Sequence, residues 1–261
     1  NGIMPDLNAR RYRNYMLAYA LTAVAGEPDE RLPQRAAQLK EKLKDLWNGA
    51  LQWYDFIGAD GKRDIRYTCQ MFKFLNSDVI GETERAGLVS HLNEREFLSE
   101  YGMHSMSKLD MQYDQDDIDN GGGGICTHFV PQICGQLYET GYDELATDIL
   151  SRIYWWGDRL PYLGDSMAAN LIWNRDSTPL QGDISSVSLA QMIILAIFGI
   201  KADFDGNVVI SPVKARPAEY MKIENVKICR KIFSVEICRD EFSVREKGKI
   251  FTAKIGDKVT L

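Results

Sequence analysis

"DISSVSLAQMIILAIFGIKADFDGNVVISPV", residues 183–213, is the stretch in which the chain changes its period. Up to Gly199 the apolar residues have helical spacing, and Asp183 or Ser185 is a suitable N-cap. After residue 205 apolar and polar residues alternate, which is the pattern of a strand. We therefore predict a helical domain over residues 1–204 and a C-terminal β domain over residues 205–261.

Upstream of this stretch, turn residues separate a series of helical patterns. The predicted helices cover residues 9–26, 30–57, 64–80, 82–98, 127–141 and 142–157. Pro131 falls in or near a first turn, where proline is tolerated, and Gly141 is a natural residue to end a helix. Consecutive antiparallel pairs joined by long loops predict a mainly α fold, a partial helical toroid or a bundle.

Downstream of the same stretch, short alternating segments such as "KIFSVEICR" and "EFSVREKG" are separated by the turn signals "DGN", "RDE" and "GDK". Alternation of this kind places one face of a sheet on a core and the other in water. The pattern predicts an antiparallel β-sandwich or sheet at the C-terminus.

Composition and charge exclude several classes of protein. The 37 acidic and 31 basic residues give a net charge of −6, and the basic residues form no long block, so we expect no nucleic acid partner. Five cysteines without a CxxC pair or a Cys/His cluster predict no disulfide framework, no metal site and no cofactor. No apolar run reaches the roughly 18 to 20 residues of a membrane span.

The chain starts at Asn1 with neither the charged start nor the apolar run of a signal peptide. This is expected of a mature chain or of a fragment of something longer. A mature or truncated chain of this type is expected to be periplasmic or extracellular.

The acidic stretch "YDQDDIDNGGGG", residues 113–124, raises the question of a metal or phosphate loop. A calcium loop that starts at Asp114 has Ile118 at its fifth position, and one that starts at Asp117 has His128 where the bidentate Glu belongs. No Gly-Lys-Ser or dinucleotide pattern follows the glycines. Two interpretations stay open: a rim where the backbone approaches a ligand closely, and a solvated acidic loop.

The order of motifs resembles that of a known group of enzymes. Helix pairs are followed by "SMSKLDMQYD", a glycine-rich turn into a helix, "YETGYDELATDIL", a buried helix that ends in "FGI", and a β domain. This order resembles the C-terminal part of the six-hairpin (α/α)6 glycoside hydrolases, in particular the α-L-rhamnosidases and the glucosidase and trehalase-like clan. The resemblance covers about residues 40–225.

The resemblance implies a glycoside hydrolase fold of about twelve helices whose N-terminal half carries the general acid. This half would be a partner of the present chain. Two stretches depart from the family pattern. The turn "NGGGGICTH" has no Trp and Arg beside it, and "LGDSMAANLIW" offers Asn170 where the rhamnosidase pattern has a catalytic glutamate.

Two segments have the residue types of a sugar site, in which carboxylates accept bonds from vicinal hydroxyls and aromatic rings cover the apolar face of a pyranose. The first, residues 99–114, offers Tyr101, His104, Asp110 and Asp114, and His128 follows it. For any one of these aspartates, and for a lone histidine, a structural role is the more common one.

The second segment, residues 154–185, mixes aromatic and charged side chains through a long loop. Its candidates for substrate binding are Arg159, Trp173 and Arg175, whereas Trp155 or Trp156 is expected to fill a helix interface. Our candidates for a catalytic base are Asp165 and Asp176, with Asp110 as the third.

These candidates support three hypotheses. The first is a glycoside hydrolase that acts on an oligo- or polysaccharide through paired carboxylates, with inversion; carboxylates about 6.5 to 9.5 Å apart invert and those about 5 to 5.5 Å apart retain, and no sequence signal pairs two of them. The second is a non-catalytic carbohydrate-binding or scaffold module, favoured by Asn170. The third is a polysaccharide lyase.

Overall fold

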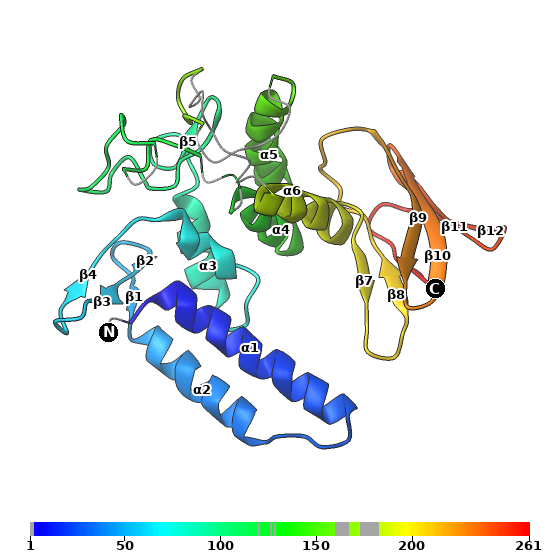
Figure 1. The fold of residues 1–261 in the computed structure, drawn as a ribbon, viewed down its shortest axis with the longest axis horizontal. Coiled ribbons are helices and arrows are strands. Elements are labelled where there is room, and N and C mark those ends of the chain that lie inside the picture. Colours follow the sequence, from blue (N-terminus) through cyan, green and yellow to red (C-terminus); the bar gives the residue numbers. More distant parts are fainter. Residues whose placement is uncertain (1–2, 119–120, 126, 128, 160–166, 173–182) are drawn as a thin grey trace. The chain divides into compact units, whose positions relative to one another are not determined.

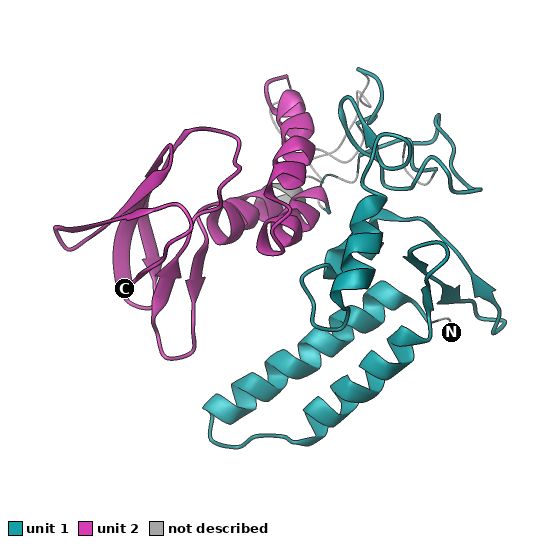
Figure 2. Cartoon of the chain, turned by 180° about the vertical axis from the view of Figure 1, so that it is seen from behind, with its two compact units in different colours: residues 1–129, 165–178 teal, residues 130–164, 179–261 magenta. Residues whose placement is uncertain are grey.

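The structure is a computed structural model that describes residues 3–118, 121–125, 127, 129–159, 167–172 and 183–261. It consists of two compact units, shown in teal and magenta in Figure 2. Unit 1 comprises residues 1–129 and 165–178, and unit 2 comprises residues 130–164 and 179–261. Each unit buries a set of apolar side chains of its own.

Unit 1 begins with a helical hairpin. Helices α1 (Pro5–Val24) and α2 (Arg31–Lys44) lie side by side (Figure 1). Pro5 stands in the first turn of α1, where a missing backbone N–H breaks no helical hydrogen bond. Gly26 follows the helix with φ 82°, a conformation that favours glycine and ends helices. The helix predicted over residues 9–26 is confirmed.

The helix predicted over residues 30–57 ends early, at Lys44, and nearly half of the prediction, residues 45–57, is wrong. The chain there forms two short antiparallel hairpins: β1 (Trp47–Asn48) with β2 (Trp53–Tyr54), and β3 (Phe56–Ile57) with β4 (Arg63–Asp64). Aromatic side chains favour strands over helices, and Gln52 takes a positive φ of 51° that no helix contains.

The next two predicted helices are also shortened. Residues 64–80 contain only the 3₁₀ helix η1 (Cys69–Phe74), because residues 67–69 pair as extended backbone with residues 105–107. Cys69 N donates to Ser105 O over 2.8 Å, and Ser107 N donates to Tyr67 O over 2.8 Å. Helix α3 (Glu82–Ser90) precedes a hairpin of β5 (Leu98–Ser99) and β6 (Gly102–Met103).

The core of unit 1 is aromatic. Trp53, Phe72 and Phe97 are fully buried. The ring centroids of Phe72 and Phe97 lie 4.9 Å apart, edge to face, and those of Trp53 and Phe72 lie 5.5 Å apart. This cluster joins the β1–β2 hairpin to η1 and to the segment before β5, and it thereby positions the loops that follow.

Unit 2 contains the remaining helices. These are α4 (Val130–Glu139), α5 (Asp143–Gly157) and α6 (Asp183–Met192), which continues as the π-helical segment η2 (Ile193–Ile197). Gly141 joins α4 to α5 with φ 84°, and Gly199 ends the last helix with φ 60°. A Cβ on Gly199 would meet the carbonyl oxygen of Ser211, so only glycine fits this helix end. The predicted ends at both glycines are confirmed.

Two antiparallel sheets follow. The larger has the order β12 (Lys249–Lys254), β11 (Glu241–Glu246), β10 (Lys231–Cys238) and β9 (Tyr220–Ile228), and the smaller has the order β13 (Val259–Thr260), β8 (Val208–Ile210) and β7 (Ile200–Ala202). Residues from both sheets form one buried cluster, which includes Val208, Ile210, Phe233, Val235 and Val244. The predicted antiparallel C-terminal sheet is confirmed.

The change from helices to strands lies close to where the sequence predicted it. The helix-to-strand change occurs at Gly199, but the domain boundary between residues 204 and 205, like the helical toroid, stays a prediction. Among the described residues, none of the helices combines the length and the apolarity that crossing a membrane would require.

Candidate functional site

Three glycines of the acidic loop lie where the chain packs tightly against itself. A Cβ on Gly123 would meet the carbonyl oxygen of Gln115, and one on Gly124 would meet that of Ile118. Gly122 has φ 88° and lies against Met106. One of the two interpretations from the sequence was that the backbone approaches a ligand closely here. For these three glycines, the close approach in the structure is to the chain itself.

The glycine turn, residues 121–125, contacts the segment that follows the predicted base Asp165. Ile125 N donates to Met167 O over 2.8 Å, and Ala169 N donates to Gly123 O over 3.1 Å. Tyr101 N donates to Ala169 O over 2.9 Å, which attaches the β5–β6 hairpin to the same segment. Two stretches about 45 residues apart in sequence are thus brought together, as a shared site requires.

The side chain of His104 is hydrogen-bonded to the glycine turn. Its side chain is fully buried, and burial lowers its pKa from 6.5 to about 4, with Lys108 adding to the fall and a bond to the Gly122 carbonyl opposing it. In the neutral ring Nδ1–H donates to Gly122 O over 3.0 Å, so Nε2 accepts from the Ser99 hydroxyl over 2.7 Å. Lys108 Nζ donates to Ser99 Oγ over 3.3 Å. This geometry favours a structural role for His104 over the predicted substrate contact.

A second polar chain joins the acidic loop to Asn170. The Tyr113 hydroxyl donates to Gln115 Oε1, and Gln115 Nε2 donates to Asn170 Oδ1 over 2.8 Å. The three side chains are half-buried. Asn170, at the expected glutamate position, therefore accepts a hydrogen bond from the side-chain amide of Gln115.

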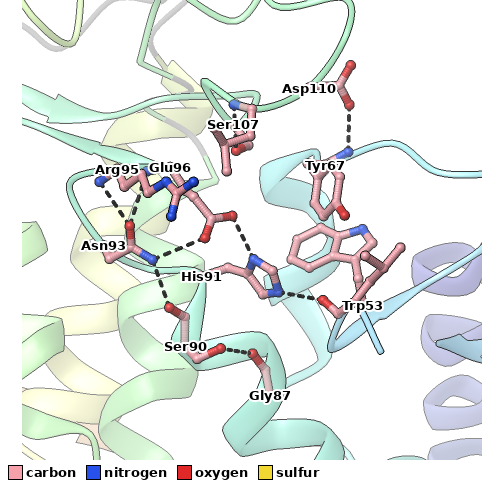
Figure 3. A network of polar contacts seen from close by, with 12 residues as sticks. Trp53, Tyr67, Gly87, Ser90, His91, Asn93, Arg95, Glu96, Ser107 and Asp110 are labelled. Carbon is pink, nitrogen blue, oxygen red and sulfur yellow. Dashed lines mark hydrogen bonds and ion pairs between the residues drawn. The ribbon is translucent and has the colours of Figure 1, made fainter. Parts of the chain in front are cut away.

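Asp110 is one of the residues that line a pocket of about 410 Å³ in unit 1. Its Oδ2 accepts from Tyr67 N over 2.8 Å (Figure 3), and its Oδ1 accepts from Gln112 N over 2.9 Å. The residue is 7% exposed. Because both oxygens accept backbone N–H groups, Asp110 fixes the loop after Ser107 to the segment after β4, and this role competes with the predicted one as a base.

Two ion pairs line the same pocket. Arg63 Nη1 lies 3.2 Å from Asp55 Oδ2, and Arg66 Nη2 lies 3.1 Å from Asp64 Oδ2. Tyr67 also lines the pocket, and its ring packs against Trp53, with 5.1 Å between the ring centroids. A carboxylate beside a guanidinium offers an acceptor and a donor to adjacent hydroxyls, and the ring offers an apolar surface.

A network behind the pocket fixes its wall (Figure 3). His91, directly after α3, places Nδ1 2.6 Å from Glu96 Oε2 and Nε2 3.0 Å from Leu51 O. Its ring meets Trp53 edge to face, with centroids 4.9 Å apart. His91 is thus a structural residue that supports Trp53 and, through it, Tyr67.

The remaining predicted site residues have diverse positions. Asp114 is exposed, and its Oδ1 accepts from Asp116 N over 3.0 Å within a turn. Arg159, in unit 2, stacks on Trp155, with 3.5 Å from Cζ to the ring centroid. Five predicted residues lie outside the described residues: Asp165, Asp176, His128, Trp173 and Arg175. In the part of the chain that the structure describes, no three His, Cys, Asp or Glu side chains group to hold a metal.

Sequence reasoning missed the pocket residues Asp55, Arg63, Asp64 and Arg66, because the surrounding segments were interpreted as helices. Two features of the sequence could have indicated a hairpin there. "ADGK" is a turn signal, and "DIRY" shortly after it alternates charged and apolar residues.

The sequence and the structure were compared with those of known proteins. No protein-family model matches the sequence, and no curated protein matches it significantly. A solved structure described as a sialidase matches 98% of this chain and 26% of its own chain, with a TM-score of 0.80 and 14% identity. A GH63 mannosylglycerate hydrolase from Thermus thermophilus matches 73% of this chain and 45% of its own, with a TM-score of 0.61 and 15% identity.

The fold is therefore glycosidase-like. The same hydrolase in complex with glucose gives a TM-score of 0.62 at 14% identity. The chain spans about a quarter of the sialidase structure and under half of the hydrolase. At such low identity these matches establish the fold alone.

Proposed function

We propose that this protein is carbohydrate-active, as a glycoside hydrolase that cleaves an oligo- or polysaccharide with paired carboxylates and inversion. One observation carries the proposal. In a glycosidase-like fold, residues 167–169, which begin two positions after Asp165, are hydrogen-bonded to the glycine turn and to Tyr101. The segments that the sequence nominated independently for sugar binding and for the base are thus neighbours.

The proposed chemistry assigns distinct roles to the loops. Asp165 is our first candidate for the base that activates water, and Asp176 is the second. The acid is assigned to chain outside these residues. Arg159, Trp173, Arg175 and His128 are proposed to contact substrate. In the pocket beside Asp110, the Tyr67 ring and the ion pair of Asp55 with Arg63 suit one sugar unit.

Hydrolysis assays test this proposal. Purified protein is incubated with a panel of nitrophenyl glycosides, sialosides and mannosylglycerate, and release of product is followed. We expect turnover that falls by at least about 100-fold in Asp165→Asn or Asp176→Asn, because general base catalysis contributes on the order of 10²–10⁴-fold. Asp205→Asn, in an exposed turn of unit 2, is the matched control and should leave turnover unchanged.

A non-catalytic carbohydrate-binding module is the second candidate, because Asn170 stands where a glutamate was expected and bonds to Gln115. Glycan binding on an array without turnover of any substrate supports this candidate. Release of an unsaturated product that absorbs in the ultraviolet would instead support a polysaccharide lyase. A periplasmic or extracellular location remains part of the proposal.

A further inference from the structure

Helix α1 has an apolar face that no other described element of unit 1 covers. Leu7, Leu17, Leu21 and Val24 are 55%, 52%, 51% and 60% exposed. Their spacing, with Arg10 and Asn14 between them, follows the alternating three- and four-residue steps of one helix face. Four large apolar side chains on one stripe differ from scattered surface leucines, and such stripes mark contact sites.

The opposite face of α1 already has its partner. Pro5 and Ala9 are buried, Tyr12 is half-buried, and α2 runs along the same hairpin (Figure 1). A helix with apolar residues on both sides is normally covered on both sides. The exposed face of α1 therefore has the composition of a helix that packs between two neighbours.

The positive charge on the exposed face of α1 indicates what charge its partner carries. Arg10 lies on the stripe, and Arg11 and Arg13 lie at its two edges, all three exposed. A second copy of α1 would bring these cations against one another in a parallel arrangement. In an antiparallel arrangement with the two stripes in full overlap, each Arg10 would face the apolar Leu21 of its partner. Acidic residues opposite the arginines avoid both costs.

We infer that this face of α1 docks an amphipathic helix that carries an apolar stripe flanked by acidic residues, supplied by chain outside these residues. The relatives leave room for such a helix, because three quarters of the sialidase chain and over half of the hydrolase chain lie beyond the part matched here. The inference concerns assembly and stands independently of the catalytic proposal.

Two designed helical peptides of about 21 residues, or three heptads, test the inference. Both have the same leucine stripe, and they differ only in flanking residues, Glu in one and Lys in the other. Fluorescence anisotropy with the 261-residue chain should give a dissociation constant for the Glu peptide at least about tenfold lower than for the Lys peptide. Added salt should reduce that difference.

Variants locate the contact. Leu17→Lys/Leu21→Lys should weaken binding of the Glu peptide by at least about tenfold, since two apolar contacts are lost. Ile232→Lys, at 54% exposure on β10, is the matched control and should bind as the parent does. Circular dichroism confirms that each variant is folded.

Three outcomes overturn the inference: no binding of the Glu peptide, equal binding of both peptides, or equal loss in the Ile232→Lys control. A dimer in sedimentation that Leu17→Lys/Leu21→Lys dissociates would also overturn it, because a second copy would then be the occupant.

Discussion

The C-terminal sheets and the glycine-turn region of unit 1 keep their shapes by different means. In the sheets, Phe233, Val235 and Val244 are almost fully buried in one cluster shared by two layers. In the glycine turn, the shape depends on close backbone contacts and on the buried polar chain through Ser99 and His104. Buried apolar area, which is spread over many residues, stabilises the sheets, whereas a few specific contacts stabilise the turn.

This difference predicts different responses to mutation. A residue in the shared cluster of the sheets contributes by its size, so the loss should scale with the volume removed. A residue in the turn contributes by its geometry, so adding one methyl group or moving one proton should matter as much as a large deletion.

The largest effect is expected in the sheets, for Phe233→Ala. The ring is 1% exposed, and removing a buried aromatic ring costs about 3–5 kcal/mol of unfolding free energy. Urea unfolding followed by circular dichroism measures the loss. Phe204→Ala, at 54% exposure, should cost less than about 0.5 kcal/mol. Equal losses in the two variants would contradict the volume argument.

Gly124→Ala should have the next largest effect. The added Cβ would meet the carbonyl oxygen of Ile118, which is backbone and cannot rotate away, so we expect a loss of about 3 kcal/mol. Gly157→Ala is the matched control, because a Cβ there meets nothing within 4 Å, and in a helix alanine is the better residue. A mild effect of Gly124→Ala would show that the turn can relax.

The same contrast explains how much could be predicted from the sequence. Alternation and turn residues are local signals, and they predicted the strands from Val208 onward and the helix ends at Gly141 and Gly199. Tyr67 and Cys69, in contrast, are extended because they pair with residues almost 40 positions away. A helical apolar pattern over residues 64–80 cannot reveal that competition.

In the candidate site, too, local signals could be predicted from the sequence, whereas contacts between distant segments could not. Composition nominated Tyr101, His104 and Asp110, and all three lie near the glycine turn or the pocket. Their roles, however, depend on burial and on partners from distant segments. Full burial of His104, for example, follows from the packing of Gly122 and Ser99 around it, and no spacing in the sequence encodes that.

Lowering the pH should destabilise the folded chain, because His104 resists protonation where it is buried against the glycine turn. Its pKa is lowered to about 4 in the folded chain and is near 6.5 when unfolded, so the unfolded state binds the proton first as pH falls. Stability is therefore lost as pH falls from 6.5 toward 4, by about 2 kcal/mol at pH 5.

Urea unfolding at pH 7 and pH 5 measures this loss in the parent and in His104→Asn, which keeps an N–H donor near Gly122 O. The variant should lose about 2 kcal/mol less between the two pH values. Asp6, whose pKa burial raises, contributes with the opposite sign in both proteins and cancels in the difference. An identical pH dependence in the two proteins would show that His104 is accessible to water.

The smallest effect is expected for Asn170→Ala, which removes the acceptor of one half-buried hydrogen bond from Gln115. We expect a loss of about 1 kcal/mol, the usual net contribution of such a bond. Gln115→Ala should cost slightly more, because it also removes the acceptor of the Tyr113 hydroxyl. In the double variant the losses should not add, since both changes break the same bond. Additive losses would mean that Asn170 acts on stability independently of Gln115, and its amide would then be available to a ligand instead of serving the loop.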